Sequence, residues 1–153
     1  MSCMRTVIQR VTRASVEIGG RNHSEIGPGL LLLLGIEESD DNSDVEWLAS
    51  KTARLRIFDD QNGVMNLSVM ETGGDVMVIS QFTLHSKTKK GNRPSYVMAA
   101  RPETAIPLYN QFVSTISGIL GKSVATGVFG AMMQVELVND GPVTIIIDTK
   151  KKE

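Results

Sequence analysis

Hydrophobic and polar residues alternate over positions 5–18, where valines recur among polar neighbours. Such alternation is typical of a β-strand with one buried face, and the Gly19-Gly20 pair after it predicts the turn of a hairpin. The next apolar run, Leu30 to Ile36, has no alternation, so we expect a central strand that is buried on both faces. The first third of the chain therefore predicts a hairpin followed by a central strand.

Two later segments repeat their apolar residues at helical spacing. The first follows candidate N-caps at Asp41 to Asp44, and we expect a helix of about three turns there. The second begins at Pro102 and is closed by two glycines. Between the two helices, Val76 to Ile79 predicts another strand buried on both faces, which runs into Ser80-Gln81-Phe82-Thr83-Leu84.

The last third of the chain predicts strands over Val124–Val128, Met133–Val138 and Val143–Asp148, with a turn at Asn139–Pro142 between the last two. The lysines at 150–152 are expected to form a frayed tail. The resulting order, ββ-βα-βα-βββ, predicts an α/β chain of the mixed α+β type. We expect a layered domain in which two helices cover one face of a mixed sheet.

Length and composition limit the class of protein. The 153 residues, with a mass of 16.6 kDa, fit one domain at residues 1–149 with a basic tail at 150–153. A content of 41% hydrophobic and 22% charged residues excludes wholesale disorder. The longest apolar run, Leu30 to Leu34, is too short to cross a bilayer, and the N-terminus has no signal-peptide core. We therefore expect a cytoplasmic protein with no membrane partner.

Few residues are available for disulfide or metal chemistry. Cys3 is the only cysteine, so the chain cannot form an internal disulfide or a cysteine cluster. His23 and His85 are the only histidines, which leaves little for a histidine-based site. We expect neither a metal nor another cofactor.

The charges are unevenly distributed, although the net charge is only −1. Acids cluster within Glu37–Glu46, and no acid lies between Asp75 and Glu103. The basic residues of that acid-free stretch are Lys87, Lys89, Lys90, Arg93 and Arg101, and a second basic group, Arg5, Arg10 and Arg13, precedes the first acid. These runs are either ordinary solvated segments or, for the basic groups, parts of a surface that binds a polyanion.

Two familiar catalytic patterns fail on their context. Gly118–Ser123 resembles the end of a phosphate-binding loop, but a predicted helix precedes a strand there, which reverses the order that the motif needs. A catalytic pair of Ser80 and His85 fails if the strand continues, because a separation of five residues places the side chains on opposite faces. We therefore expect His85 to be a loop residue.

Two features remain as candidates for chemistry. Ser80, Gln81 and Thr83 form a polar group at a strand end, where loops gather ligands but where hydroxyls also serve as local hydrogen-bond partners. Gly141-Pro142 interrupts two predicted strands, either as a hairpin turn or as a cis peptide, which occurs at about 5–6% of X-Pro bonds. The residues alone leave both choices open.

The sequence resembles the D-aminoacyl-tRNA deacylase family, formerly called the D-tyrosyl-tRNA deacylases, over nearly its whole length. The opening Ile8–Val16 and the loop Gly91–Tyr96 are similar to the corresponding segments of the family. Ser80–Leu84 resembles the first family signature, and Asn139–Thr144 resembles the second, the Gly-cisPro motif. The resemblance implies a single-domain three-layer β/β/α sandwich that works as a homodimer.

The same resemblance implies an activity and roles for residues. The enzyme would hydrolyse the ester that joins a D-amino acid, or glycine, to the terminal adenosine of tRNA, and it would reject L-aminoacyl-tRNA as a proofreading step in translation. Thr83, at the reacting ester, with Ser80 and Gln81 would be the catalytic group, and Phe82 would bind substrate. Gly141-Pro142 of one subunit would exclude L side chains from the pocket of the other.

The polyanion implied by the resemblance is the acceptor stem of tRNA. Its expected contacts are Lys87, Lys89, Lys90 and Arg93. Backbone donors and a ribose hydroxyl of the substrate suffice for an activated ester, so no triad is required. Two other classes stay open: a module that binds RNA ends without hydrolysis, and a conventional hydrolase of small esters that is acylated at Thr83 or Ser80.

Overall fold

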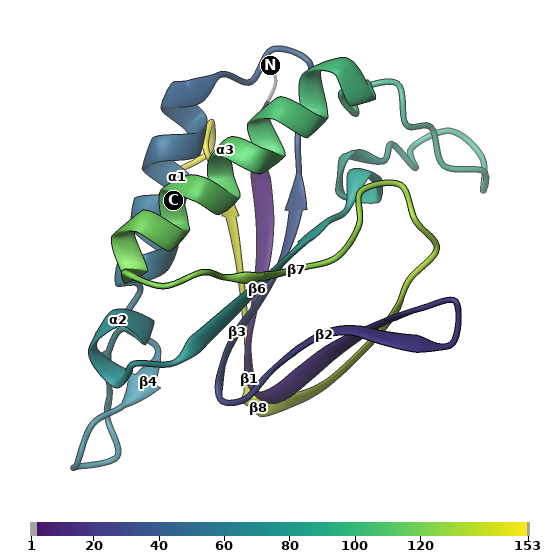
Figure 1. Ribbon diagram of the computed structural model, residues 1–153. Helices are drawn as coiled ribbons and strands as arrows, with labels where there is room; N and C mark the ends of the chain where they lie inside the picture. The colour runs from purple at the N-terminus through teal and green to yellow at the C-terminus, as the bar shows by residue number, and fades with distance from the viewer. Residues whose placement is uncertain (1–2, 153) are drawn as a thin grey trace.

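The computed structural model describes residues 3–152, which form a curved sheet with helices packed against it (Figure 1). The elements are β1 (Arg5–Ile18), β2 (Arg21–Ile26), β3 (Gly29–Gly35), α1 (Asn42–Arg54), β4 (Phe58–Asp59), β5 (Met65–Leu67), α2 (Val69–Thr72), β6 (Asp75–Ser80), the short 3-10 helix η1 (Phe82–His85), α3 (Pro102–Leu120), β7 (Ala125–Thr126) and β8 (Gln134–Asp148). The predicted mixed α+β class is confirmed. The short elements β4, β5, α2 and η1 lie outside the sequence prediction.

Six strands form one mixed sheet in the order β2-β1-β3-β6-β7, with β8 also paired to β1. β1 is antiparallel to β2, β3 and β8, whereas β3, β6 and β7 run parallel to one another. The parallel register places Leu34 beside Ser80, so β3 and β6 end at the same edge of the sheet. The small β4–β5 hairpin is a separate sheet.

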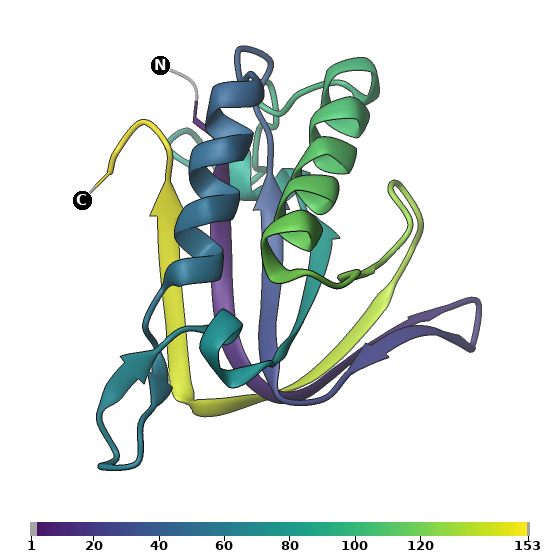
Figure 2. The same cartoon turned by 60° about the vertical axis from the view of Figure 1, so that its left-hand side comes forward.

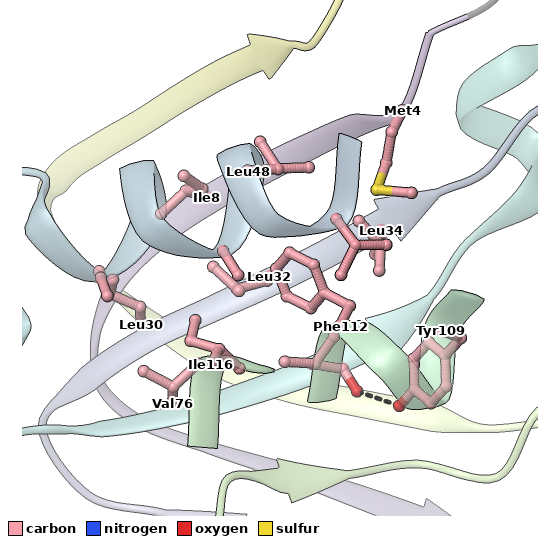
Figure 3. Packing of buried hydrophobic residues seen from close by; sticks show 14 of the residues in the cluster. Met4, Ile8, Leu30, Leu32, Leu34, Leu48, Val76, Tyr109, Phe112 and Ile116 are labelled. Atoms are coloured by element: carbon pink, nitrogen blue, oxygen red, sulfur yellow. Dashed lines mark hydrogen bonds between the residues drawn. The ribbon is translucent and has the colours of Figure 1, made fainter. Parts of the chain in front are cut away.

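α1 and α3 lie together over one face of the sheet, as predicted (Figure 2). Asp41 begins α1 through a capping box with Asp44, and Pro102 occupies the first turn of α3. Tyr109 of α3 donates a 2.7 Å hydrogen bond from its buried hydroxyl to the carbonyl of Val78 (Figure 3). The largest fully buried residues of this core include Met4, Ile8, Leu30, Leu32, Leu34, Leu48, Phe112 and Ile116.

A second apolar core lies on the other face of the sheet, where the ends of β1 and β2 and the start of β8 curl over (Figures 1 and 2). Its buried members are Val11, Ala14, Val16, Ile26, Leu31, Met77 and Ile79. Ser24 of β2 donates a 2.7 Å hydrogen bond to the carbonyl of Thr126 in β7, so the bent sheet nearly closes on itself. The three-layer sandwich is a finer description and stays a prediction.

The C-terminal strands differ from the prediction. Both halves of β8 pair with β1, so the expected hairpin turn at Asn139–Pro142 is wrong. Gln9 lies opposite Thr144 and Val11 opposite Asn139, which leaves residues 140–143 as a bulge facing Arg10. The apolar pattern predicts the two strand segments but not the strand with which each one pairs. Because β1 is long, both segments can pair with it, and the residues between them form a bulge. The predicted strand at 124–128 is also shorter, and only Ala125–Thr126 pairs.

The lysine tail packs on α1 instead of fraying. The ammonium of Lys150 lies 3.0 Å from the Asp44 carboxylate. The ammonium of Lys152 lies 4.5 Å from the centre of the Trp47 ring, a cation–π distance. Within residues 3–152, no helix has the length and apolarity to cross a membrane.

Candidate active site

A cleft of about 520 Å³ opens at the sheet edge where β6 ends. Ser80, Gln81 and Phe82 line one wall, so the structure brings three of the predicted site residues together. The backbone N–H of Gln81 donates to the carbonyl of Leu34 at 2.8 Å, which extends the pairing of β3 and β6 by one residue. The end of a rigid parallel strand therefore fixes the backbone of this wall.

The opposite wall comes from the segment between β7 and β8, which the sequence analysis does not single out. Phe129 to Met133 and Val135 line the cleft there. Met132 is apolar but 85% exposed, so this wall presents apolar surface to whatever enters the cleft. The signal available in the sequence is an apolar stretch between two predicted strands that has no strand alternation.

Thr83 lies beside the cleft, in η1, and its side chain is half-buried. Its hydroxyl accepts a hydrogen bond from the side-chain amide of Gln81. Among residues 3–152, no imidazole or carboxylate forms a hydrogen bond with this hydroxyl. The site therefore holds Thr83 in place without offering it a general base.

His85 departs from its prediction in two ways. The strand ends at Ser80 and gives way to η1, so the strand-face argument against a Ser80 and His85 pair does not apply. His85 is also not an ordinary loop residue, because its side chain is only 1% exposed and its Nδ1 lies 3.0 Å from Oε1 of Glu37. It lies against Glu37 and is not among the residues that line the cleft.

Cys3, Glu37 and His85 form a buried group whose potential ligand atoms lie within 4.8 Å of one another. The backbone N–H of Cys3 donates to Oε2 of Glu37 at 3.0 Å. Burial raises the pKa of the Cys3 thiol to about 12, which keeps it protonated at neutral pH. The cleft lining itself contains no histidine, cysteine or carboxylate in the described part of the chain.

The predicted basic loop begins next to the cleft. The backbones of Lys87 and Ser95 exchange two hydrogen bonds of 2.8 and 2.9 Å, which pin the base of the loop. Tyr96 stacks edge-on against Phe82, with 5.1 Å between ring centres. The predicted tRNA contacts Lys87, Lys89, Lys90 and Arg93 are exposed, and within residues 3–152 they form no ion pair. Positive charge therefore stands free beside the cleft.

The N-terminal basic group does not form a free positive surface, because its arginines are paired with acids. Arg5 pairs with Asp148 at 3.0 Å, and the exposed Arg13 pairs with Glu136 at 2.6 Å. Arg10 is buried and faces the bulge of β8, where Asp140 lies 3.5 Å from its guanidinium. Each arginine of β1 is therefore matched by an acid of β8.

The acidic run is not a solvated loop either. Glu38 accepts 2.8 Å hydrogen bonds from the backbone N–H of Arg101 and the hydroxyl of Thr104, and so ties the start of α3 to the segment after β3. Asp40 is buried and accepts a 2.7 Å bond from the backbone N–H of Glu37. Burial raises the pKa of the Asp40 carboxyl to about 7. These acids serve the connection between β3 and the two helices.

Gly141-Pro142 is a cis peptide, as the resemblance implies. Gly141 has φ of +131°, and a Cβ there would lie 2.8 Å from Cγ2 of Val143, so only glycine fits. The strand register places Ser80 of β6 level with Ile147 of β8, which is three strands away across the sheet. Gly141 lies a further six residues along β8 from Ile147. The two predicted signatures are thus on the order of 20 Å apart within one chain, and a single chain does not bring them together.

The fold is that of the tRNA deacylases. A solved structure described as a probable eukaryotic D-amino acid tRNA deacylase matches with a TM-score of 0.82, covering 95% of this chain and 99% of that chain. Its sequence identity is 15%, so this match establishes the fold alone. The structure of a c-Myc DNA unwinding element binding protein matches with a TM-score of 0.89 and 41% identity, covering 94% of this chain and 97% of that chain.

The sequence model of the D-Tyr-tRNA(Tyr) deacylase family matches residues 7–148. D-aminoacyl-tRNA deacylases from Bacteroides thetaiotaomicron and Porphyromonas gingivalis are 61% and 63% identical to this chain over 150 residues. In both comparisons the match spans 98% of this chain and 100% of the relative. The chain therefore belongs to the D-Tyr-tRNA(Tyr) deacylase family.

Proposed function

We propose that the protein hydrolyses the ester of D-aminoacyl-tRNA and releases the free D-amino acid and intact tRNA. The observation that supports this most directly is the cleft at the end of β6, which is built from Ser80, Gln81 and Phe82 of the first family signature. The polar strand end faces an apolar wall at Phe129–Met133. Such a cleft suits a ligand with an aromatic base on one side and an ester on the other.

The chemistry that this cleft supports is electrostatic rather than nucleophilic. The backbone N–H groups of Phe82 and Thr83 follow the last paired residue of β6 and lie in the first turn of η1, where such donors lack backbone acceptors. They can stabilise an oxyanion that develops on the ester carbonyl. The neighbouring ribose hydroxyl of the substrate can assist the attack on an ester that is already activated.

This mechanism makes a specific prediction for Thr83. Because no general base among residues 3–152 contacts its hydroxyl, Thr83→Ala retains much of the wild-type kcat, within about tenfold. Single-turnover deacylation of D-Tyr-tRNA measures this. A trapped acyl adduct on Thr83 would contradict the mechanism and favour the conventional hydrolase.

The basic loop supplies the affinity for tRNA. Its four exposed cations belong to the loop whose Tyr96 packs against Phe82, and they can meet phosphates of the acceptor stem. The single domain at 1–149 and a cytoplasmic location fit a role in translation, with D-aminoacyl-tRNA and glycyl-tRNA mischarged on tRNA-Ala as the substrates.

The stereochemical filter is supplied by a second copy of the chain in a two-fold symmetric homodimer. Gly141 and Pro142 are exposed and lie at the far end of the sheet from Ser80, so they can reach a cleft only in another subunit. The parallel carbonyls expected at this motif leave no room for the side chain of an L-amino acid. Sedimentation of the purified protein at several concentrations tests the dimer.

The decisive experiment incubates the protein with D-Tyr-tRNA and L-Tyr-tRNA side by side. Release of D-tyrosine without release of L-tyrosine is the expected result. Equal release from both, or tight binding of tRNA without release from either, contradicts the proposal. The latter result would favour a module that binds RNA ends.

A further inference from the structure

The short helix η1 carries Phe82, which lines the cleft, at its front, with Thr83 next in sequence, and Leu84 and His85 at its back. It has only four residues, so its own hydrogen bonds cannot hold it rigidly. Its back rests directly on β3, because a Cβ added to Gly35 would lie 3.0 Å from both the His85 ring and Cβ of Leu84. The position of the cleft wall therefore depends on what holds the back of η1.

The first anchor at the back of η1 is the buried pair of His85 and Glu37. Nδ1 of His85 lies 3.0 Å from Oε1 of Glu37, and the two side chains are 1% and 7% exposed. Glu37 is itself fixed on several sides. Its backbone N–H donates to Asp40, its Oε2 accepts from the backbone N–H of Cys3, and it forms an isolated bridge with Ala99.

The second anchor is Arg5 of β1. Its Nη1 donates a 2.8 Å hydrogen bond to the carbonyl of Leu84, the residue before His85. The other edge of the same guanidinium contacts Asp148 at 3.0 Å, so the fork is held in one orientation. Two charged groups, Glu37 just after β3 and Arg5 in β1, thus converge on consecutive residues of η1.

We propose that Glu37, His85 and Arg5 are positioning residues, which hold η1 so that the backbone of Phe82 and Thr83 faces the ester. This inference rests on the proposed deacylase function. None of the three residues lines the cleft, so each acts through η1 and not on the substrate. Because misplacement by about 1 Å can cost about a hundredfold in rate, loss of one anchor lowers kcat by about 10- to 100-fold. KM for tRNA stays within about twofold, since the basic loop that provides affinity is unchanged.

The test compares four variants of the full-length protein. His85→Ala removes the first anchor, and His85→Asn restores a nitrogen close to the position of Nδ1. Gly35→Ala pushes the back of η1 without removing any polar group. Ala53→Gly is the control, because Ala53 is also buried but lies in α1, away from η1 in the sequence. Glycine inside a helix lowers the stability of the protein without touching either anchor of η1.

Two readouts are measured on each variant: amide hydrogen exchange of a peptide covering residues 81–88, and single-turnover deacylation of D-Tyr-tRNA. We expect about tenfold faster exchange and reduced kcat in His85→Ala and Gly35→Ala, near-wild-type values in His85→Asn, and no change of either in Ala53→Gly. A second comparison adds Glu37→Ala and the double substitution of Glu37 and His85 to alanine. The double substitution should reduce kcat no further than either single one, since the two residues act as one unit.

Unchanged exchange at 81–88 in His85→Ala would overturn the anchoring. Faster exchange with full kcat would overturn the link between η1 and catalysis. If the wild-type protein releases no D-tyrosine but His85→Ala still speeds exchange, the deacylase function fails while the anchoring of η1 stands.

Discussion

Replacement of Arg10 by methionine tests how the bulge of β8 is held. The buried guanidinium donates from Nη1 to the carbonyl of Ile57 at 2.7 Å and from Nε to the carbonyl of Asp140 at 3.1 Å. Hydrogen bonds from charged donors contribute about 1.5–3 kcal/mol each, so their sum is about 3–6 kcal/mol. Contacts with the carboxylates of Asp59 and Asp140, which are 54% and 50% exposed, add little because solvent screens them. Methionine recovers part of the burial, and we expect a net loss of about 3 kcal/mol in the free energy of unfolding.

Urea unfolding followed by the fluorescence of Trp47, the single tryptophan, measures this loss at one fixed protein concentration. The same change at Arg13 is the matched control. Arg13 lies on the same strand, but it and its partner Glu136 are 56% and 68% exposed, so Arg13→Met costs at most about 0.5 kcal/mol. In the proposed dimer, Arg10→Met also displaces Gly141 and reduces the preference for D- over L-Tyr-tRNA. Equal losses of stability in the two variants would refute the assignment of Arg10 as the support of the bulge.

Three further predictions concern the fold and its charges. Gly29→Ala unfolds the protein or lowers its Tm severely, because a Cβ would lie 1.8 Å from the Asp75 carbonyl oxygen. Gly118→Ala, with open space around it in α3, raises the free energy of unfolding by about 0.5–1 kcal/mol. Thermal melts compare the two variants. Asp40 has a pKa of about 7 in the folded protein, above its unfolded value, so stability falls as the pH rises from about 4 to 7. Asp40→Asn should flatten that fall in Tm measured across this range, and an unchanged slope would contradict it. Removal of charge from the basic loop should reduce the slope of log affinity for tRNA against log salt concentration. The reduction is about 0.7 to 0.9 for each phosphate that the loop no longer neutralises, and filter binding from low to high salt measures it. The residues to replace by alanine are Lys87, Lys89, Lys90 and Arg93.

The long elements of the fold are predictable from the sequence because one periodic signal dominates each of them. The stripe of α3 and the unbroken apolar run of β3 are examples, and both lie where the pattern places them. The pairing of residues 134–148 is not predictable in this way, since a glycine followed by a proline is compatible with a bulge as well as with a turn. The length of β1, 14 residues, decides between them, and only the pairing reveals that both halves of β8 use it.

The polar half of the cleft is predictable and the apolar half is not. Ser80 and Gln81 stand out as polar residues at the end of an apolar strand. The segment Phe129–Met133 is mostly apolar, and nothing in its pattern distinguishes it from other apolar segments in a chain that is 41% hydrophobic. Charge runs mislead for a related reason. Glu38, Asp44 and the arginines of β1 look like surface features in the sequence, but tertiary partners far along the chain bind or neutralise them. The basic loop at 87–93 keeps its charge free, because its side chains are exposed and form no ion pair within residues 3–152.

The two signatures occupy opposite ends of the same sheet, and this geometry restricts how they can cooperate. β6 runs parallel to β3, β3 is antiparallel to β1, and β1 is antiparallel to β8, so Ser80 and Gly141 are fixed at different edges by backbone pairing that spans the whole core. No hinge within residues 3–152 can close a gap on the order of 20 Å without breaking that pairing. If both signatures act on one substrate, they must therefore come from two chains. A two-fold axis then satisfies both clefts with a single kind of interface, since each chain offers its bulge and receives the other's.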